Sequence, residues 1–564
     1  MAKGEAEVDV VVIGSGFGGS VVARKLACRH RSVLVLERGQ PHPPGSFLRT
    51  THGMRTNFWE PAKSLFGMFD LWSFDHLDVV LSSGLGGGSL IYANVLLRKP
   101  PETFVKEDLS SGGWENWPVS GSDLRPHYEE IEELLNPEPY PFDSDPYAST
   151  PKTIAMQEAA EKLELRDSLE RPPLAIAFGG INDPPGSPLG GPANLFEVQR
   201  TTCRLCGECD IGCNYGSKST LDLTLLSEAK AEGAELRTCC EAVKIKPYGS
   251  GYTVHYRQHL AARDGRSGEL FDPSGDPSGT VTAKRVVIAA GTLGSPRLLL
   301  KSRLDLQHLS PALGRRFSAN GDYLAWIRNC RDPETGDWRR LEPSRGPVIT
   351  SSIRIDEERS SSGREHYLQD AGAPAIADWL WQLVELPGNL WRTRAALARH
   401  AWDRLRGRPH THESGMLAAL FGDAHASNAM MPVLAMGRDY SSGKLRLDGE
   451  GLQLDWSREP SEKYYESVRS SLSELAEAMG GELMTDGLDL LHKAITVHPV
   501  GGCAMATDPY HGVVDAFGEV FGHKGLFVAD GSVMPGPVGP NPSLTIAALA
   551  DRFANKILEE IDRD

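Results

Sequence analysis

Four cysteines stand within eleven residues, in the run CRLCGECDIGC: Cys203, Cys206, Cys209 and Cys213. The spacing C-x2-C-x2-C-x3-C is typical of a loop that holds an iron–sulfur cluster, here of the 4Fe–4S or 3Fe–4S type. A zinc site is a second interpretation, although zinc sites more often show two separated C-x2-C pairs. Four free thiols are a third interpretation. Asn214, which follows the last cysteine, weakens the match to a ferredoxin loop, because such loops usually have Pro at that position.

A glycine motif near the start of the chain predicts a nucleotide-binding unit. Gly14, Gly16 and Gly19 form G-x-G-x-x-G between the apolar run VDVVVIG and a stretch with helical spacing. In this βαβ setting the first glycine makes a tight turn, the second lets backbone approach a pyrophosphate, and the third allows close packing. Glu37 ends the next strand, SVLVLE, where it is expected to bind ribose hydroxyls. NAD and FAD both use this unit.

Other glycine-rich segments fit a flat cofactor. Residues 82–98 read SSGLGGGSLIYANVLLR, and their glycines leave room for backbone to lie against a ring or a pyrophosphate. Residues 285–300, RVVIAAGTLGSPRLLL, predict a buried strand, a turn and a helix. Near the C-terminus, KGLFVADGSVMP predicts a strand that ends at Asp530 and Gly531.

Together with residues 498–549, these segments resemble the glucose–methanol–choline (GMC) oxidoreductases, FAD-dependent enzymes that oxidise alcohols, and most of all their cholesterol-oxidase-like branch. The resemblance covers the FAD-binding parts, about half of the chain. It implies that FAD is the cofactor, that Asn94 lies near the reactive face of the flavin, and that Asp530 bonds to the phosphate or ribityl region. The residues expected at the cofactor are Gly14, Gly16, Gly19, Glu37, Gly84, Gly87, Gly88, Ser89, Asn94, Val243, Ala290, Gly291, Asp530, Gly531 and Pro542.

The candidate catalytic residues are His498 and Asn541. Oxidation of an alcohol requires removal of the hydroxyl proton as hydride leaves carbon, and neutral imidazole suits this task near pH 7. A neighbouring amide can hydrogen-bond the developing alkoxide. The resemblance matches His498 to the family's H-P-x-G-G motif and Asn541 to its V-G-x-N-P motif. Cholesterol oxidases also use a Glu from the substrate domain, for which Glu385 and Glu413 are unassigned candidates.

The predicted fold is α/β, or α+β for the whole chain. We expect a Rossmann-type FAD-binding domain, formed by residues 1–125, 200–315 and 490–564, interleaved with a substrate domain, formed by residues 126–199 and 316–489. Alternating and apolar runs in the middle of the chain predict an antiparallel sheet with covering helices. Residues 376–407 form a Trp-rich cap, interpreted as core packing rather than as a substrate lid or a lipid-contacting surface.

Composition limits partners and location. The 564 residues carry a net charge of −16, which argues against nucleic acid or an anionic membrane surface as a partner. Nine cysteines without a short disulfide framework suit a reducing compartment. The start MAKGEAEVDVVVIG has no signal-peptide pattern, and no apolar window is long enough for a transmembrane segment. We therefore expect a cytoplasmic protein, with peripheral membrane contact left open.

The sequence thus predicts an alcohol oxidoreductase that moves hydride from a bulky, apolar alcohol, such as a sterol or terpenoid, to FAD. The iron–sulfur cluster would pass the electrons singly to an external acceptor. In one alternative, a sterol-oxidase-like enzyme gives them directly to oxygen and makes hydrogen peroxide. In two others, the chain is an electron-transfer protein without its own alcohol substrate, or a flavin-binding protein without turnover.

Overall fold

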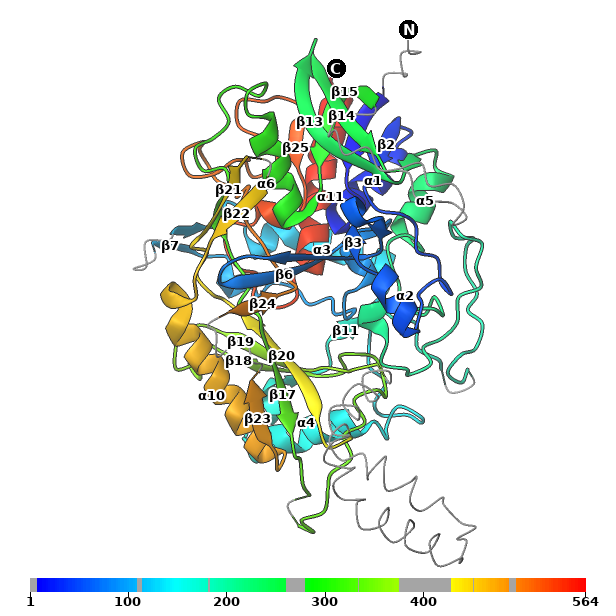
Figure 1. Ribbon diagram of the computed structural model, residues 1–564, viewed down its shortest axis with the longest axis vertical. Coiled ribbons are helices and arrows are strands. Elements are labelled where there is room, and N and C mark those ends of the chain that lie inside the picture. Colours follow the sequence, from blue (N-terminus) through cyan, green and yellow to red (C-terminus); the bar gives the residue numbers. More distant parts are fainter. Residues whose placement is uncertain are drawn as a thin grey trace, which may run out of the picture.

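The computed structural model describes residues 8–564 apart from residues 109–113, 181–182, 260–278, 333, 375–427, 450 and 486–492. Two large sheets dominate the molecule, one in the upper and one in the lower half of Figure 1. The Trp-rich cap, with Glu385 and Glu413, lies outside the described residues.

The upper sheet gathers seven strands from distant parts of the chain. Their order is β12–β2–β1–β15–β14–β13, with β25 also beside β15. The strands are β1 (Val8–Ile13), β2 (Val33–Leu36), β12 (Glu235–Arg237), β13 (Cys240–Tyr248), β14 (Gly251–Gln258), β15 (Gly279–Ile288) and β25 (Leu526–Val528). β12, β2, β1, β15 and β25 run parallel, whereas β14 and β13 continue the sheet antiparallel. Apart from Asp9, β1 and β2 consist of Val, Ile and Leu, because parallel strands are buried on both faces.

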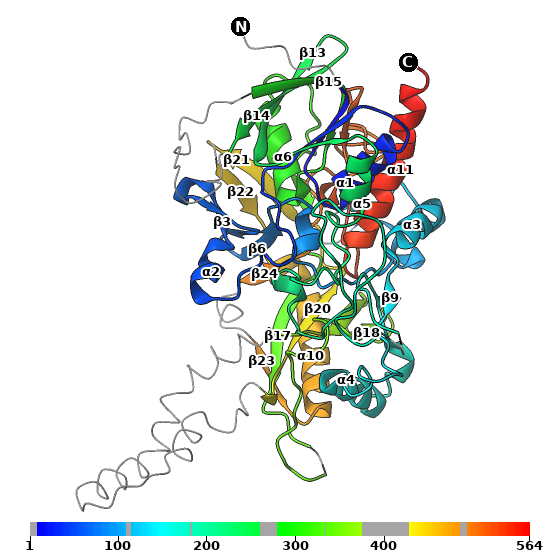
Figure 2. The ribbon, with the colours of Figure 1, turned by 90° about the vertical axis from the view of Figure 1, so that its right-hand side faces the viewer.

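Helices cover one side of this sheet, as Figure 2 shows for α1 (Phe17–Ala27), α3 (Gly121–Leu135) and α11 (Ser543–Ile561). α1 packs against α11 and α5 (Leu225–Ala231), and α3 packs on α11. Glycine lets α1 come close to the sheet: a Cβ at Gly18 would lie 1.6 Å from the Ala529 carbonyl oxygen. α6 (Gly291–Ser302) follows β15 and packs against β13.

The lower sheet is antiparallel throughout, in the order β10–β18–β19–β20–β17–β23. Its strands are β10 (Leu169–Glu170), β17 (Tyr323–Arg328), β18 (Ser352–Ile355), β19 (His366–Asp370), β20 (Met431–Gly437) and β23 (Glu482–Thr485). Alternate residues of β17 and β20 enter a core with α10 (Glu462–Ala478) and α4 (Pro151–Lys162). The opposite residues of these strands face the upper half of the molecule.

Smaller sheets connect the two halves. One, of β5 (Phe69–Ser73), β6 (Leu77–Ser82) and β24 (Ala494–Thr496), lies between the large sheets in Figure 1. Another pairs β16 (Arg315–Phe317), β21 (Gly443–Asp448) and β22 (Gly451–Asp455). The remaining elements are α2 (Thr51–Thr56), β3 (Trp59–Glu60), β4 (Leu65–Phe66), β7 (Lys106–Asp108), β8 (Trp114–Asn116), β9 (Glu138–Pro139) and β11 (Pro173–Leu174), with short 3-10 turns.

This architecture confirms the predicted fold class, a mixed α/β fold with helices on its sheets. Among the described helices, none has the length and apolar character needed to cross a bilayer.

Candidate active site

A cavity of about 1350 Å³ lies between the two large sheets and receives side chains from both. Pockets for single small molecules usually measure about 300–1,000 Å³. The cavity is therefore large enough for a cofactor together with a second molecule. Its floor is the edge where β1, β2, β15 and β25 end, which is where open α/β sheets bind ligands.

The N-terminus of α1 forms an anion cradle at one end of the cavity. Its first turn has no acidic residue and no side-chain cap, so its backbone N–H groups can bind phosphate. A Cβ placed on Gly16 or Gly88 would meet no atom within 4 Å, because both backbones border open space. The two glycine loops also touch, since a Cβ on Gly87 would lie 2.6 Å from Gly16 Cα. The cradle fits the pyrophosphate of a dinucleotide.

Glu37 lines the cavity directly after β2, and only 5% of it is exposed. Its carboxylate accepts hydrogen bonds from the backbone N–H and the hydroxyl of Ser15, at 3.0 and 2.6 Å, and from the N–H of Gly39 at 2.8 Å. Glu37 thus stabilises the glycine turn. From the sequence, its carboxylate was expected to bind the ribose hydroxyls of the cofactor, and the contact with the turn was not expected.

Asp530 ties together the ends of β15 and β25. It accepts hydrogen bonds from the N–H of Gly291 at 2.9 Å, from the N–H of Ser532 at 2.8 Å, and from the Ser295 hydroxyl. Burial raises the pKa of its carboxyl. Ala290, Gly291 and Gly531 line the same wall, and Val243 and Pro542 also reach the cavity.

Four of the predicted cofactor residues lie behind the cavity lining: Gly19, Gly84, Ser89 and Asn94. Gly19 packs on the glycine turn, since a Cβ there would lie 2.0 Å from the Gly14 carbonyl oxygen. The Ser89 hydroxyl donates to the Gly86 carbonyl oxygen at 2.8 Å and accepts from the Leu221 N–H at 3.0 Å. Asn94 is fully buried with a φ of 70°.

His498 lines the same cavity, two residues after β24, with 14% of its side chain exposed. Its Nδ1 lies 2.9 Å from Oδ1 of Asp322, which also lines the cavity. Asp322 immediately precedes β17, and the sequence analysis missed it. No motif in the run SANGDY marks it, because its partner lies 176 positions further along the chain.

Asn541 reaches the same cavity and is 4% exposed. Its Oδ1 accepts a hydrogen bond of 3.0 Å from Nε2 of Gln369, on β19. The donors at Nδ2 are therefore what Asn541 can offer to a ligand. Asn320 holds the preceding loop: its Oδ1 accepts from the Val538 N–H at 2.8 Å and its Nδ2 donates to the Pro540 carbonyl oxygen at 3.1 Å. The structure thus brings the two predicted catalytic residues to one cavity.

The wall opposite the nucleotide cradle is apolar. The residues of the lower sheet that face away from its core line it: Leu324 and Trp326 from β17, and Pro432 and Leu434 from β20. Ile495 and Val497, beside His498, continue this surface. A hydrocarbon body can bind here while its polar end reaches His498.

The four cysteines of the loop line one small, separate cavity together with Lys218. Burial raises the pKa of the thiols of Cys203, Cys206 and Cys209, that of Cys206 to about 12, so these thiols are neutral at pH 7. Within the described ranges, no group of three or more His, Cys, Asp or Glu side chains could hold a metal ion. The iron–sulfur cluster and the zinc site therefore have no direct support from the geometry.

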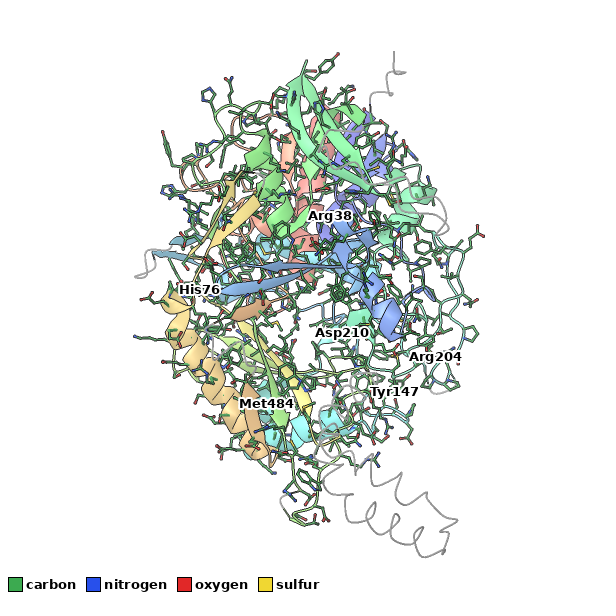
Figure 3. The ribbon with its side chains drawn as sticks, in the orientation of Figure 1. Arg38, His76, Tyr147, Arg204, Asp210 and Met484 are labelled. Carbon is green, nitrogen blue, oxygen red and sulfur yellow. The ribbon has the colours of Figure 1, made fainter. Side chains whose placement is uncertain are left out.

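The cysteine loop nevertheless borders the large cavity. Asp210 and Ile211, which follow Cys209, line the large cavity. Figure 3 labels Asp210 in the middle of the molecule, with Arg38, another lining residue, nearer the upper sheet. Lys218 donates to the Cys209 carbonyl oxygen at 2.7 Å, and its ammonium lies 4.7 Å from the ring of Tyr92, which lines the large cavity.

The chain is similar to several known proteins. The N-terminal and C-terminal family models described as GMC oxidoreductase match residues 8–320 and 450–550. A cholesterol oxidase of Acinetobacter baumannii is 29% identical, over 98% of this chain and 94% of its own. A cholesterol oxidase of Mycobacterium tuberculosis is 28% identical, over 97% and 91%. The structure of a fungal aryl-alcohol oxidase has a TM-score of 0.57 at 18% identity, covering 99% of both chains.

The chain belongs to the GMC oxidoreductase family, because the N-terminal model alone matches more than half of it. This confirms the family that the motifs indicated. The protein is an FAD-dependent oxidoreductase that acts on CH–OH groups, and the glycine cradle described above fits this cofactor.

Proposed function

We propose that this protein oxidises a bulky, apolar alcohol with His498 and Asn541 as its catalytic residues. The observation that carries the proposal is that both side chains line one cavity with the nucleotide cradle at one end and an apolar wall at the other. FAD bound in the cradle would supply the hydride acceptor. The names of the cholesterol oxidases that the chain resembles support a sterol-sized substrate.

In this proposal His498 removes the hydroxyl proton through Nε2 while Asn541 donates a hydrogen bond to the alcohol oxygen from Nδ2. Loss of the proton and of a hydride from the carbinol carbon gives a carbonyl product. The apolar wall of Leu324, Trp326 and Leu434 holds the hydrocarbon body and excludes water. The predicted cofactor residues that line the cavity keep their proposed binding roles, whereas Gly19, Gly84, Ser89 and Asn94 support this lining from behind.

A panel of alcohols added anaerobically to the purified protein tests this function. We expect sterols and other large apolar alcohols to bleach the flavin absorption faster than sugars or short alcohols. In the His498→Gln variant, bleaching should slow by about 10²-fold or more, the usual contribution of a positioned acid–base group. The variant should keep its FAD, because none of the contacts described for the nucleotide cradle involves His498.

Two outcomes would contradict the proposal. If no alcohol in the panel reduces the flavin while dithionite does, the protein lacks this activity. If the His498→Gln variant is reduced at the parent rate, the site assignment is wrong. His511→Gln is a suitable control, since this exposed histidine lies outside the cavity lining.

The proposal has two forms, which differ in the electron acceptor that reoxidises the flavin. Oxygen as the acceptor is supported by the related proteins, which are named oxidases. The other acceptor, reached through an iron–sulfur cluster, rests on the C-x2-C-x2-C-x3-C spacing of the four cysteines, since no described group of side chains is placed to hold a metal ion. A cluster would supply the positive charge that turns these thiols into thiolates.

Iron and acid-labile sulfide in anaerobically purified protein decide between these acceptors. A cluster predicts about three or four irons per chain. The iron should be lost in Cys206→Ala, which removes a cysteine of the loop. It should be retained in Cys330→Ala, because Cys330 is buried in the core of the lower sheet. A cluster also predicts slow reduction of oxygen. The absence of iron, together with four titratable thiols in the loop and rapid formation of hydrogen peroxide, would contradict the cluster. Oxygen would then be the electron acceptor.

A further inference from the structure

One short turn between β16 and β17 contacts both catalytic segments. Asn320 binds the loop that ends at Asn541, and Asp322 binds the segment that ends at His498. Both side chains are almost fully buried, with 0% and 2% exposed. Of the two, only Asp322 contacts His498, the side chain that acts as the base in the proposed reaction.

The two carboxylate oxygens of Asp322 have different partners. Oδ2 accepts hydrogen bonds from the Thr496 hydroxyl at 2.9 Å, the Val497 N–H at 2.8 Å and the His498 N–H at 3.0 Å. Oδ1 is 2.9 Å from the Nδ1 atom of His498. Oδ2 alone is therefore sufficient to hold the backbone after β24, and Oδ1 is directed to the imidazole.

A carboxylate cannot donate a hydrogen bond, so a contact of this length places the proton of neutral imidazole on Nδ1. Nε2 then carries the lone pair. When Nε2 takes a proton, the carboxylate also stabilises the imidazolium that forms, as in a serine-protease triad. Both effects increase the ability of His498 to act as a base.

We propose that Asp322 is a positioning residue that holds His498 in the tautomer whose Nε2 accepts the alcohol proton. This inference rests on the proposed role of His498. It also gives the active site an acid from the lower half of the molecule, because Asp322 leads directly into β17 of the antiparallel sheet.

One other buried acid contacts this turn. Asp439 accepts hydrogen bonds from the Ser318 hydroxyl and from the Ala319 N–H, at 3.1 Å for the latter. Burial raises the pKa of Asp439 to about 7. It has no contact with His498, so it supports the turn rather than the imidazole.

The ¹⁵N spectrum of the FAD-loaded protein, labelled at histidine nitrogens, reads the tautomer directly. Comparison with the His498→Gln variant assigns the two nitrogens of His498. At a pH where the ring is neutral, we expect a protonated Nδ1 and an unprotonated Nε2. A His498 ring with its proton on Nε2 in the parent protein would overturn the proposal, whatever the variants do.

Kinetics of flavin reduction give the second readout. Asp322→Asn should slow reduction by a saturating alcohol about 10²-fold or more while leaving the apparent Kd for the alcohol within about 3-fold, and it should lose the Nδ1–H signal. Asp322→Glu should restore part of the rate, because it keeps the carboxylate. Asp551→Asn is the matched control: Asp551 contacts Nδ1 of His127 at 2.7 Å, outside the cavity lining, and should change neither readout.

The outcomes separate the two proposals. A His498→Gln variant that is reduced at the parent rate contradicts the proposed function itself. A slow His498→Gln variant beside an Asp322→Asn variant with the parent rate and the parent spectrum contradicts only the role of Asp322.

Discussion

Burial changes how individual side chains titrate in this protein. The ring of His42 stacks on Phe47, and its Nε2 is buried without a hydrogen-bond partner. Burial lowers the pKa of His42 to about 4. Acids show the opposite effect, since burial raises the pKa of Asp210 and of Asp222 to about 6. Such shifts affect the stability of the fold without belonging to the catalytic chemistry.

His42 predicts a specific loss of stability in acid. Its folded pKa is below its unfolded value, so between about pH 6.5 and pH 4 the unfolded chain binds a proton that the folded chain does not. The folded state therefore loses stability as the pH falls through this window. His42→Phe removes the effect, and relative to the parent it should gain about 1–2 kcal/mol at pH 5 compared with pH 8.

Urea unfolding at the two pH values measures this difference. The exposed His76 serves as the control and is replaced by Phe in the same way. Equal pH dependence of the parent and the His42→Phe variant would show that the buried ring does not carry this penalty.

At the scale of elements, the glycines around α1 serve two different purposes. Gly14 has a φ of 101°, and a Cβ on it would lie 2.2 Å from the Ala289 carbonyl oxygen, so it is required for packing the turn against β15. Gly16 has a φ of −71° and open space where a Cβ would be. Its lack of a side chain is explained by the cofactor that binds there.

Substitution by alanine should separate the two purposes. Gly16→Ala is expected to leave the stability of the FAD-free protein within about 0.5 kcal/mol while weakening FAD binding by at least about 10-fold, because the added methyl group occupies ligand space. Gly14→Ala should destabilise the FAD-free protein by about 1–3 kcal/mol. Thermal unfolding and FAD titration of the FAD-free proteins give the two quantities.

Gly45→Ala controls for backbone strain alone, since Gly45 has a φ of 90° but a Cβ on it would meet no atom within 4 Å. It should cost less stability than Gly14→Ala and bind FAD normally. Normal FAD affinity in Gly16→Ala would mean that the pyrophosphate does not approach this turn.

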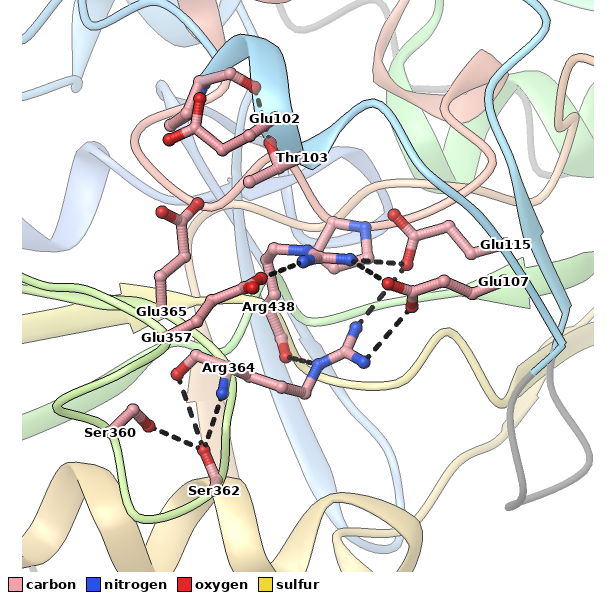
Figure 4. Close-up of polar contacts among 12 residues, drawn as sticks. Glu102, Thr103, Glu107, Glu115, Glu357, Ser360, Ser362, Arg364, Glu365 and Arg438 are labelled. Carbon is pink, nitrogen blue, oxygen red and sulfur yellow. Dashed lines mark hydrogen bonds and ion pairs between the residues drawn. The ribbon is translucent and has the colours of Figure 1, made fainter.

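At the scale of the whole molecule, the active site exists because two sheets built from distant segments face one cavity. A partly buried network of charges connects distant segments, and Figure 4 shows it around Arg364 and Arg438. Arg438, with 1% of its side chain exposed, lies 2.8 Å from Glu357 and 3.2 Å from Glu107, and Arg364 lies 3.5 Å from Glu107 and from Glu115. The network joins β7 and β8 to the ends of β19 and β20. The division of the chain into two interleaved domains remains a prediction.

The amino-acid sequence by itself determined the nucleotide-binding unit and the family. The run of apolar β-branched residues, the glycine turn and Glu37 are close together in the chain, so their structure follows from local geometry and burial. The resemblance of the motifs around His498 and Asn541 to those of the family gave the two catalytic candidates. The antiparallel sheet followed from its alternating residues.

The tertiary structure alone decided which side chains support these candidates. Asp322 and His498 are 176 positions apart, and Gln369 and Asn541 are 172 apart. No local pattern encodes such pairs, because they depend on how the lower sheet packs against the ends of β24 and α11. The same holds for the cysteines, whose spacing is visible in the sequence. That they line one cavity beside the cofactor site follows only from the folding of the whole chain around them.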